Sequence, residues 1–215
     1  MEKQLLVLDK EIELLTKDNS VKGIMLIGSV SYGTANKYSD LDLIVLCDKD
    51  KFFVKEVDGI TVEIHYSKYE TLLRKLESSP IEVYKYLYSK IILDNGSLKA
   101  LIEKAKNIYQ NYQTPIKEKE NIKYWLKATK IKLISALENK DELKLSYLLS
   151  TNTWKLLEGL FSINNKPMPP SSLTYYLSKD MHIELDDWFT KLLIGNVLDK
   201  TESMIKLIDF VNEKL

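Results

Sequence analysis

The sequence predicts an α+β fold, with a mixed β-sheet and flanking helices first and an all-helical bundle after it. Short apolar runs typical of buried strands occur only in the first half of the 215-residue chain. An Asp58-Gly59 pair between β-rich flanks indicates a hairpin in that half. Beyond residues 111–115 the apolar residues recur only at helical spacing. We therefore expect two domains, 1–112 and 113–215.

The elements of the first domain follow from local spacing. Leu5, Leu8, Ile12 and Leu15 predict an amphipathic helix over the first 17 residues. A two-residue Asp58-Gly59 turn would place Val57 opposite Ile60, and Val54 opposite Glu63. The other predicted elements are strands at 23–27, 41–47 and 91–93, and helices at 68–78 and 97–110.

The second domain carries only helical patterns. The Pro-rich stretch 164–172, NNKPMPPSS, predicts a rigid connector. Trp125, Trp154 and Trp188 lie at helical positions, so we expect them in the core. The predicted helices are 117–139, 141–162, 184–194 and 199–214.

Composition excludes several classes of protein. Lys plus Arg equals Asp plus Glu at 31 each, and Arg74 is the only arginine, so the charge balance disfavours binding to a nucleic-acid backbone. Cys47 is the sole cysteine, which excludes an intrachain disulfide and a cysteine-based zinc cluster. The start is charged and amphipathic, and no long apolar segment occurs. We expect a cytoplasmic protein without membrane association.

Two carboxylates, Asp40 and Asp42, open the apolar run 41–47. In a strand their side chains would share one face, with Cα atoms roughly 6.6 Å apart. Two carboxylates so placed can converge on Mg²⁺, which prefers oxygen ligands. Glu63 lies mid-strand and would complete a three-carboxylate site if its strand pairs beside 41–47. The less specific alternatives are a solvated turn for the aspartates and a water-facing edge position for Glu63.

A Gly28-Ser29 pair ends the first predicted strand, twelve residues before Asp40. Glycine lets a phosphate approach the backbone, and Ser29 can N-cap a short following helix. Lys37 could add a positive charge from the intervening loop.

Other polar and aromatic residues are weaker candidates for the site. His65 would share the face of Glu63, where a structural role is favoured, and His182 is expected at the surface. Tyr32 and Tyr38 flank the Gly-Ser loop and are candidate ligand contacts by location.

The stretch GSVSYGTANKYSDLDLIVL, residues 28–46, resembles the signature of the DNA polymerase β-like nucleotidyltransferase superfamily. The pattern is an apolar residue, Gly-Ser, a spacer and Asp-apolar-Asp-apolar, with a third acid on a later strand that TVEIH matches through Glu63. The chain is most similar in plan to bacterial aminoglycoside-type nucleotidyltransferases, which pair this fold with a C-terminal helical domain.

The resemblance implies specific roles. Asp40, Asp42 and Glu63 would be catalytic and would bind one or two Mg²⁺ ions, while Gly28, Ser29 and Lys37 would contact the nucleotide. The expected reaction transfers a nucleoside monophosphate, most often AMP from ATP, to a hydroxyl group and releases pyrophosphate. No position matches a motif that would assign the general base.

The acceptor stays open at this point. We expect a small molecule such as an aminoglycoside-like antibiotic. The alternatives are a protein acceptor, through AMPylation or an antitoxin-like role, and a non-catalytic nucleotide-binding module. The oligomeric state is open too, with a homodimer as one alternative.

Overall fold

The computed structural model describes residues 2–181, 183–185 and 187–215. The chain forms two compact units, Met1–Asn111 and Tyr112–Leu215. Each unit has its own cluster of buried apolar side chains.

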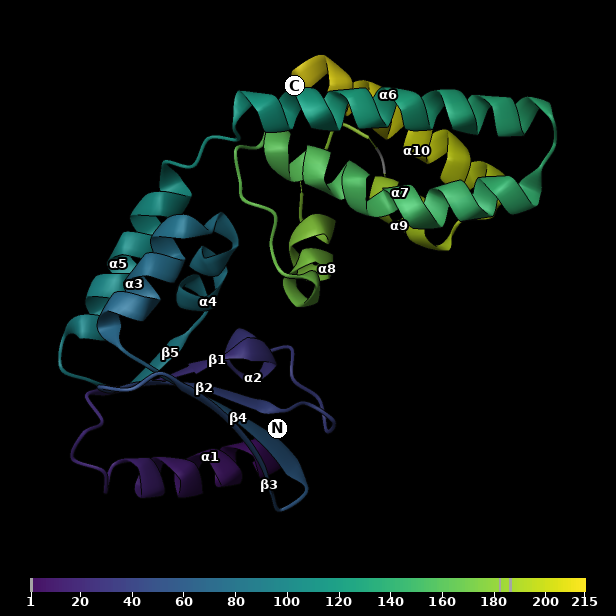
Figure 1. The fold of residues 1–215 in the computed structure, drawn as a ribbon. Helices are drawn as coiled ribbons and strands as arrows, with labels where there is room; N and C mark the ends of the chain where they lie inside the picture. Colours follow the sequence, from purple (N-terminus) through teal and green to yellow (C-terminus); the bar gives the residue numbers. More distant parts are fainter. Residues whose placement is uncertain (1, 182, 186) are drawn as a thin grey trace. The chain divides into compact units, whose positions relative to one another are not determined.

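A five-stranded mixed sheet forms the centre of the first unit, in the order β3-β4-β2-β1-β5 (Figure 1). β2 and β4 pair in parallel, and all other neighbours in the sheet are antiparallel. The prediction of a mixed sheet with flanking helices is therefore confirmed. The strands are β1 (Gly23–Ile27), β2 (Leu41–Leu46), β3 (Lys51–Val57), β4 (Ile60–Ser67) and β5 (Lys90–Asp94).

The β3–β4 hairpin has the predicted register. Val57 lies opposite Ile60, and Val54 lies opposite Glu63. Asp58 and Gly59 both have positive φ, 52° and 71°. A type I′ turn requires this conformation at both central residues, and the Asp-Gly pair adopts it readily.

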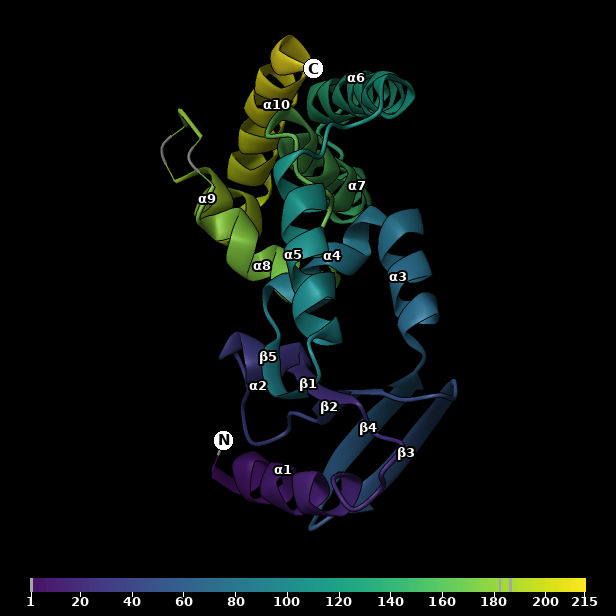
Figure 2. The same ribbon diagram turned by 90° about the vertical axis from the view of Figure 1, so that its left-hand side faces the viewer.

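Helices cover both faces of the sheet. α1 lies on one face, and α3, α4 and α5 lie on the other (Figures 1 and 2). Val7, Leu8 and Leu15 of α1 pack against β-strand residues, whereas Leu5 is 47% exposed, contrary to its predicted place in the apolar stripe. The helices are α1 (Glu2–Leu15), α2 (Gly28–Tyr32), α3 (Tyr69–Ser78), the 3-10 helix η1 (Pro80–Glu82), α4 (Val83–Leu87) and α5 (Ser97–Gln110).

The second unit contains only helices among its described residues. α6, α7 and α10 pack against one another, and α9 packs on α10. Trp188 is buried as predicted, but Trp125 and Trp154 are 46% and 43% exposed, so their predicted core position is wrong. The helices are α6 (Ile116–Glu138), α7 (Glu142–Ile163), α8 (Ser171–Lys179), α9 (Trp188–Ile194) and α10 (Val197–Lys214).

Two helices of the second unit differ from the sequence prediction. α9 begins at Trp188 rather than at residue 184, and α8 begins within the stretch that was predicted to be only a connector. His182, expected at the surface, lies outside the described residues. No helix in the described part of the chain is long and apolar enough to cross a bilayer.

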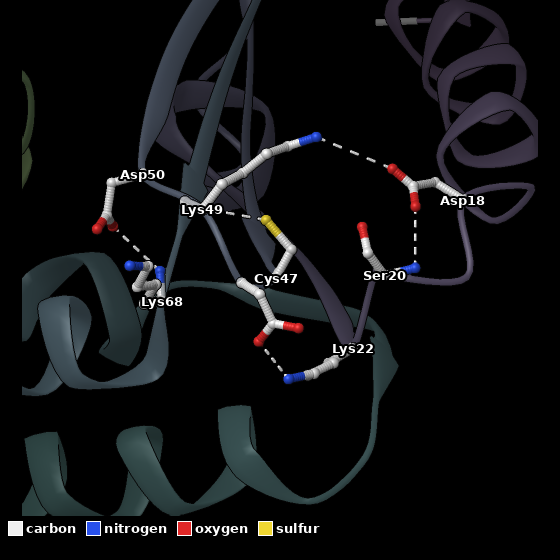
Figure 3. Close-up of polar contacts among 8 residues, drawn as sticks. Asp18, Ser20, Lys22, Cys47, Lys49, Asp50 and Lys68 are labelled. Carbon is white, nitrogen blue, oxygen red and sulfur yellow. Dashed lines mark hydrogen bonds and ion pairs between the residues drawn. The ribbon is translucent and has the colours of Figure 1, made fainter.

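The carboxyl end of β2 is tied to neighbouring loops by exposed polar contacts (Figure 3). Lys22 pairs with Asp48 at 2.5 Å, and Lys49 approaches Asp18 at 4.0 Å. Cys47 is buried, as predicted, and its thiol lies 3.5 Å from the Lys49 carbonyl oxygen. Surface pairs of this kind contribute little stability individually. The carboxylates Asp40 and Asp42 lie at the opposite end of β2, where the strand begins.

Candidate active site

A glycine turn joins β1 to α2. Gly28 has φ of +71°, and a Cβ added there would lie 1.9 Å from Oδ2 of Asp42. Gly28 is therefore required for two reasons, its left-handed backbone and the carboxylate packed directly against it. The packing of Asp42 against Gly28 brings the Gly-Ser pair and the Asp-Leu-Asp segment of the motif together.

The register of the sheet aligns two of the predicted acids. Asp42 of β2 lies opposite Ile27 of β1 on one side and opposite Glu63 of β4 on the other. Directly opposed residues point to the same face of a sheet, about 4.8 Å apart between strands. The condition set for Glu63, that its strand pairs beside β2, is met. Asp40 lies two residues before Asp42, just outside the strand.

These three residues, named here the three-carboxylate site, interact electrostatically. Burial raises the pKa of Asp42 to about 7, and the charges of Asp40 and Glu63 add to the effect in that order. Desolvation and like charges both disfavour the ionised form of a carboxyl group. Ionisation of Asp42 therefore costs free energy in the folded chain.

The donor set of the three-carboxylate site suits a hard cation. All of its ligating atoms are carboxylate oxygens, which Mg²⁺ prefers, and Asp42 and Glu63 are strand neighbours. As the side chains stand, no group of three or more His, Cys, Asp and Glu in the described residues is arranged to hold a metal ion.

Ser29 occupies a different place from the predicted one. The residue preceding α2 is Ile27, and no side chain caps this helix, so the predicted N-cap role of Ser29 is wrong. The hydroxyl of Ser29 is buried and has no hydrogen-bond partner. A buried hydroxyl without a partner costs free energy unless a water, an ion or a ligand completes its bonding.

α1 holds the loop that carries Lys37 and Asp40. The side chain of Gln4 is buried, and its Nε2 donates to the carbonyl oxygens of Asn36 at 2.7 Å and Ser39 at 3.3 Å. Lys37 itself is exposed, with its Nζ 4.8 Å from the centre of the Tyr38 ring. Sequence reasoning missed Gln4, although a glutamine at the spacing of Leu8 and Leu15 was a usable signal.

The two tyrosines that flank the Gly-Ser loop differ in position. Burial, then the nearby charge of Asp42, raises the pKa of Tyr32, whose ring packs edge-on against Tyr88 at 5.8 Å. Tyr38 is 83% exposed. Tyr32 therefore borders the three-carboxylate site, and Tyr38 points into solvent.

His65 follows Glu63 on the same face of β4. Burial lowers its pKa, and the charges of Lys85 and Lys75 lower it further. Its ring lies against Phe52 with the ring centres 4.6 Å apart.

A comparison with protein families identifies the family of the chain. The family model of the nucleotidyltransferase domain matches residues 8–138, more than half of the chain. The chain belongs to this nucleotidyltransferase family. The match includes Gly28, both aspartates and Glu63.

No curated protein matches this nucleotidyltransferase. Among solved structures, a nucleotidyltransferase-like protein from Exiguobacterium sibiricum 255-15 is similar, with 11% identity and a TM-score of 0.44. That alignment covers 98% of this chain and 74% of the other.

Proposed function

We propose that this nucleotidyltransferase transfers AMP from ATP to a hydroxyl group of a small-molecule acceptor, in a Mg²⁺-dependent reaction. The observation that carries the proposal is the position of Asp42, packed on Gly28 and directly opposite Glu63. A half-buried carboxylate beside two others is stabilised when cations offset its charge.

Asp40, Asp42 and Glu63 would hold one or two Mg²⁺ ions. Bound there, the metal would neutralise phosphate charge and stabilise the leaving pyrophosphate. The backbone at Gly28 would lie against the triphosphate, and the unpaired Ser29 hydroxyl would donate to a phosphate oxygen. Lys37 would reach the phosphates from its exposed loop.

The transfer itself is a substitution at phosphorus. The acceptor oxygen forms a bond to the α-phosphorus, the bond from that phosphorus to the bridging oxygen breaks, and pyrophosphate leaves. The hydroxyl proton passes to solvent. The protein contributes chiefly positioning and electrostatic stabilisation, as is general for phosphoryl transfer.

The test is calorimetric titration of each of the four nucleoside triphosphates with Mg²⁺ into wild type and Asp42→Asn. Asp48→Asn is the matched control, because Asp48 follows the same strand at its other end and is exposed. We expect ATP to bind wild type and the control with equal affinity, and Asp42→Asn to bind at least tenfold more weakly.

A screen for pyrophosphate release then identifies the acceptor, beginning with aminoglycosides and lincosamides. If no nucleotide binds wild type, the proposed donor site is wrong. If a nucleotide binds but neither small molecules nor proteins become labelled, the protein is a nucleotide-binding module without transferase activity.

A further inference from the structure

Tyr32 is a half-buried residue beside the three-carboxylate site, and the proposed function gives it no role. It is the last residue of α2, four positions after Gly28. Residues four apart share one face of a helix, and a helical side chain leans back over the preceding turn. The Tyr32 ring therefore lies over the turn that begins at Gly28, against which Asp42 packs.

The surroundings of the Tyr32 phenol agree with this placement. Burial makes the largest contribution to its raised pKa, and the charge of Asp42 raises the pKa further. A hydrogen bond with the Gly28 backbone acts in the opposite direction. The phenol oxygen is thus close both to the turn on which the triphosphate would rest and to a carboxylate that would hold the cation.

The short helix α2 depends on other elements for its position. It spans five residues, and no side chain caps its start. A helix of this length is not stable alone, so contacts with the rest of the unit must hold it. Val30 packs in the apolar core of the first unit, and the next two residues, Ser31 and Tyr32, both contact Tyr88.

Tyr88 connects α2 to the interior of the first unit. The buried Ser31 donates from Oγ to the Tyr88 carbonyl oxygen at 2.5 Å, and the Tyr32 and Tyr88 rings meet edge-on with centres 5.8 Å apart. The Tyr88 ring is stacked on Tyr84 of α4, which is fully buried, with centres 6.4 Å apart. Tyr84 in turn packs edge-on against Tyr109 of α5. This row of rings fixes the side of α2 that carries Tyr32.

We propose that Tyr32 is a positioning residue of the nucleotide site. Its hydroxyl keeps the Gly28 turn and the Asp42 carboxylate in the arrangement that receives the phosphates and their cation, and Tyr88 holds its ring in place. The inference rests on the proposed function, since it assumes a nucleotide on that turn. A tyrosine used only for packing would need its ring and not its hydroxyl, which separates the two roles.

The test removes the hydroxyl and the supporting ring separately. Tyr32→Phe loses only the hydroxyl, whereas Tyr88→Leu removes the supporting ring. Tyr66→Phe is the matched control, because Tyr66 is also half-buried but lies on the face of β4 opposite to Glu63. Mg²⁺ with ATP is titrated calorimetrically into the full chain of each variant, and urea unfolding without ligand measures its stability.

We expect Tyr32→Phe to bind ATP with Mg²⁺ about fivefold more weakly than wild type, the effect of one lost hydrogen bond. Its urea midpoint should fall no further than that of Tyr66→Phe, which should bind ATP as wild type does. Tyr88→Leu should also weaken binding, and the conservative Tyr88→Phe, which keeps the ring, should restore it.

A second measurement uses Mg²⁺ alone and protein labelled with fluorotyrosine. Tyr32→Phe and Tyr66→Phe assign the two fluorine NMR signals by their absence. Mg²⁺ should shift the Tyr32 signal in wild type but not in Asp42→Asn, and it should leave the Tyr66 signal in place in both.

The inference is wrong if Tyr32→Phe binds ATP as wild type does, if Tyr66→Phe loses as much affinity, or if Mg²⁺ leaves the Tyr32 signal unchanged. Loss of ATP binding in Asp42→Asn without any loss in Tyr32→Phe rejects only the role of Tyr32. Absence of ATP binding to wild type rejects the proposed nucleotide site, and the inference with it.

Discussion

Replacing Asp42 with Asn should stabilise the metal-free protein at high pH. Asp42 has a pKa of about 7 in the folded chain, against an ordinary value near 3.9 when unfolded. Between these two values the folded state holds a proton that the unfolded state has lost. The free energy of unfolding therefore decreases as the pH rises from about 4 to about 7. Asparagine, neutral at every pH, removes this dependence.

The size of the effect follows from the pKa difference. Three pKa units correspond to an upper limit of about 4 kcal/mol. Asp42 is still partly accessible to solvent, which screens the interaction, so we expect about 2 kcal/mol. At pH 4.5, where the loss has only begun, Asp42→Asn should exceed wild type in stability by less than about 1 kcal/mol. At pH 8 the variant should be more stable by about 2 kcal/mol.

The assay is urea unfolding in EDTA at pH 4.5 and 8. Tryptophan fluorescence would report on the wrong unit, because all three tryptophans follow Tyr112. The methyl NMR signals of Leu43 and Val45, buried in β2, report on the first unit. Asp48→Asn is the control, and its stability should stay close to that of wild type. If the curves of wild type and Asp42→Asn run parallel from pH 4.5 to 8, the electrostatic argument is refuted.

Four further predictions follow from the same site. Gly28→Ala should abolish activity and destabilise the fold by more than Gly33→Ala, as measured by urea unfolding. Both glycines have positive φ, but only a Cβ at Gly28 would collide with Asp42. Ser29→Ala should leave stability within about 0.5 kcal/mol of wild type yet weaken ATP binding severalfold in calorimetry, because the hydroxyl has no partner within the protein. Gln4→Leu should raise KM for ATP more than it lowers kcat, with partial rescue in Gln4→Asn, if the loop position rather than stability is affected. Millimolar Mg²⁺ should stabilise wild type at pH 8 but not Asp42→Asn, and equal stabilisation of both would reject the metal ligand.

Local chemistry made much of the fold predictable. The Asp58-Gly59 pair specified the hairpin register because few other dipeptides tolerate two positive φ values. α5 begins and ends where its apolar spacing predicts. The pairing of β2 with β4 was only the condition under which Glu63 would join Asp42, and the register meets that condition.

The missed elements lacked a clear periodic signal. α4 spans five residues, too few to show a helical period, and its alternating tyrosines resemble a strand. α8 follows two prolines, which were interpreted only as a break in helical structure. Proline also occurs at the start of helices, as it does here. Trp125 and Trp154 lie at helical positions but stay partly exposed. Helical spacing thus identifies an apolar stripe without showing whether other helices pack over it.

Side-chain bonding at the site was beyond the reach of the sequence. The motif identified Gly28, Ser29, Asp40 and Asp42 as a set, yet it assigned Ser29 to a cap that the backbone does not provide. The hydrogen bonds from Gln4 to the carbonyl oxygens of Asn36 and Ser39 depend on which turn of α1 faces this loop. Contacts of this kind are set by tertiary packing, which local spacing does not encode.

Three costs to stability in the first unit meet at the proposed site. Gly28 has a backbone conformation that other residues rarely adopt, Ser29 buries an unpaired hydroxyl, and the ionisation of Asp42 is opposed by burial and two like charges. By contrast, the buried Glu11 is paired with Lys55 at 2.6 Å. Natural sequences tolerate such local conflicts mainly where function requires them. One ligand, a nucleotide with its cation, would relieve two of the three at once, by accepting from Ser29 and by offsetting the charge of Asp42. The third, the bare backbone of Gly28, is what lets that ligand approach.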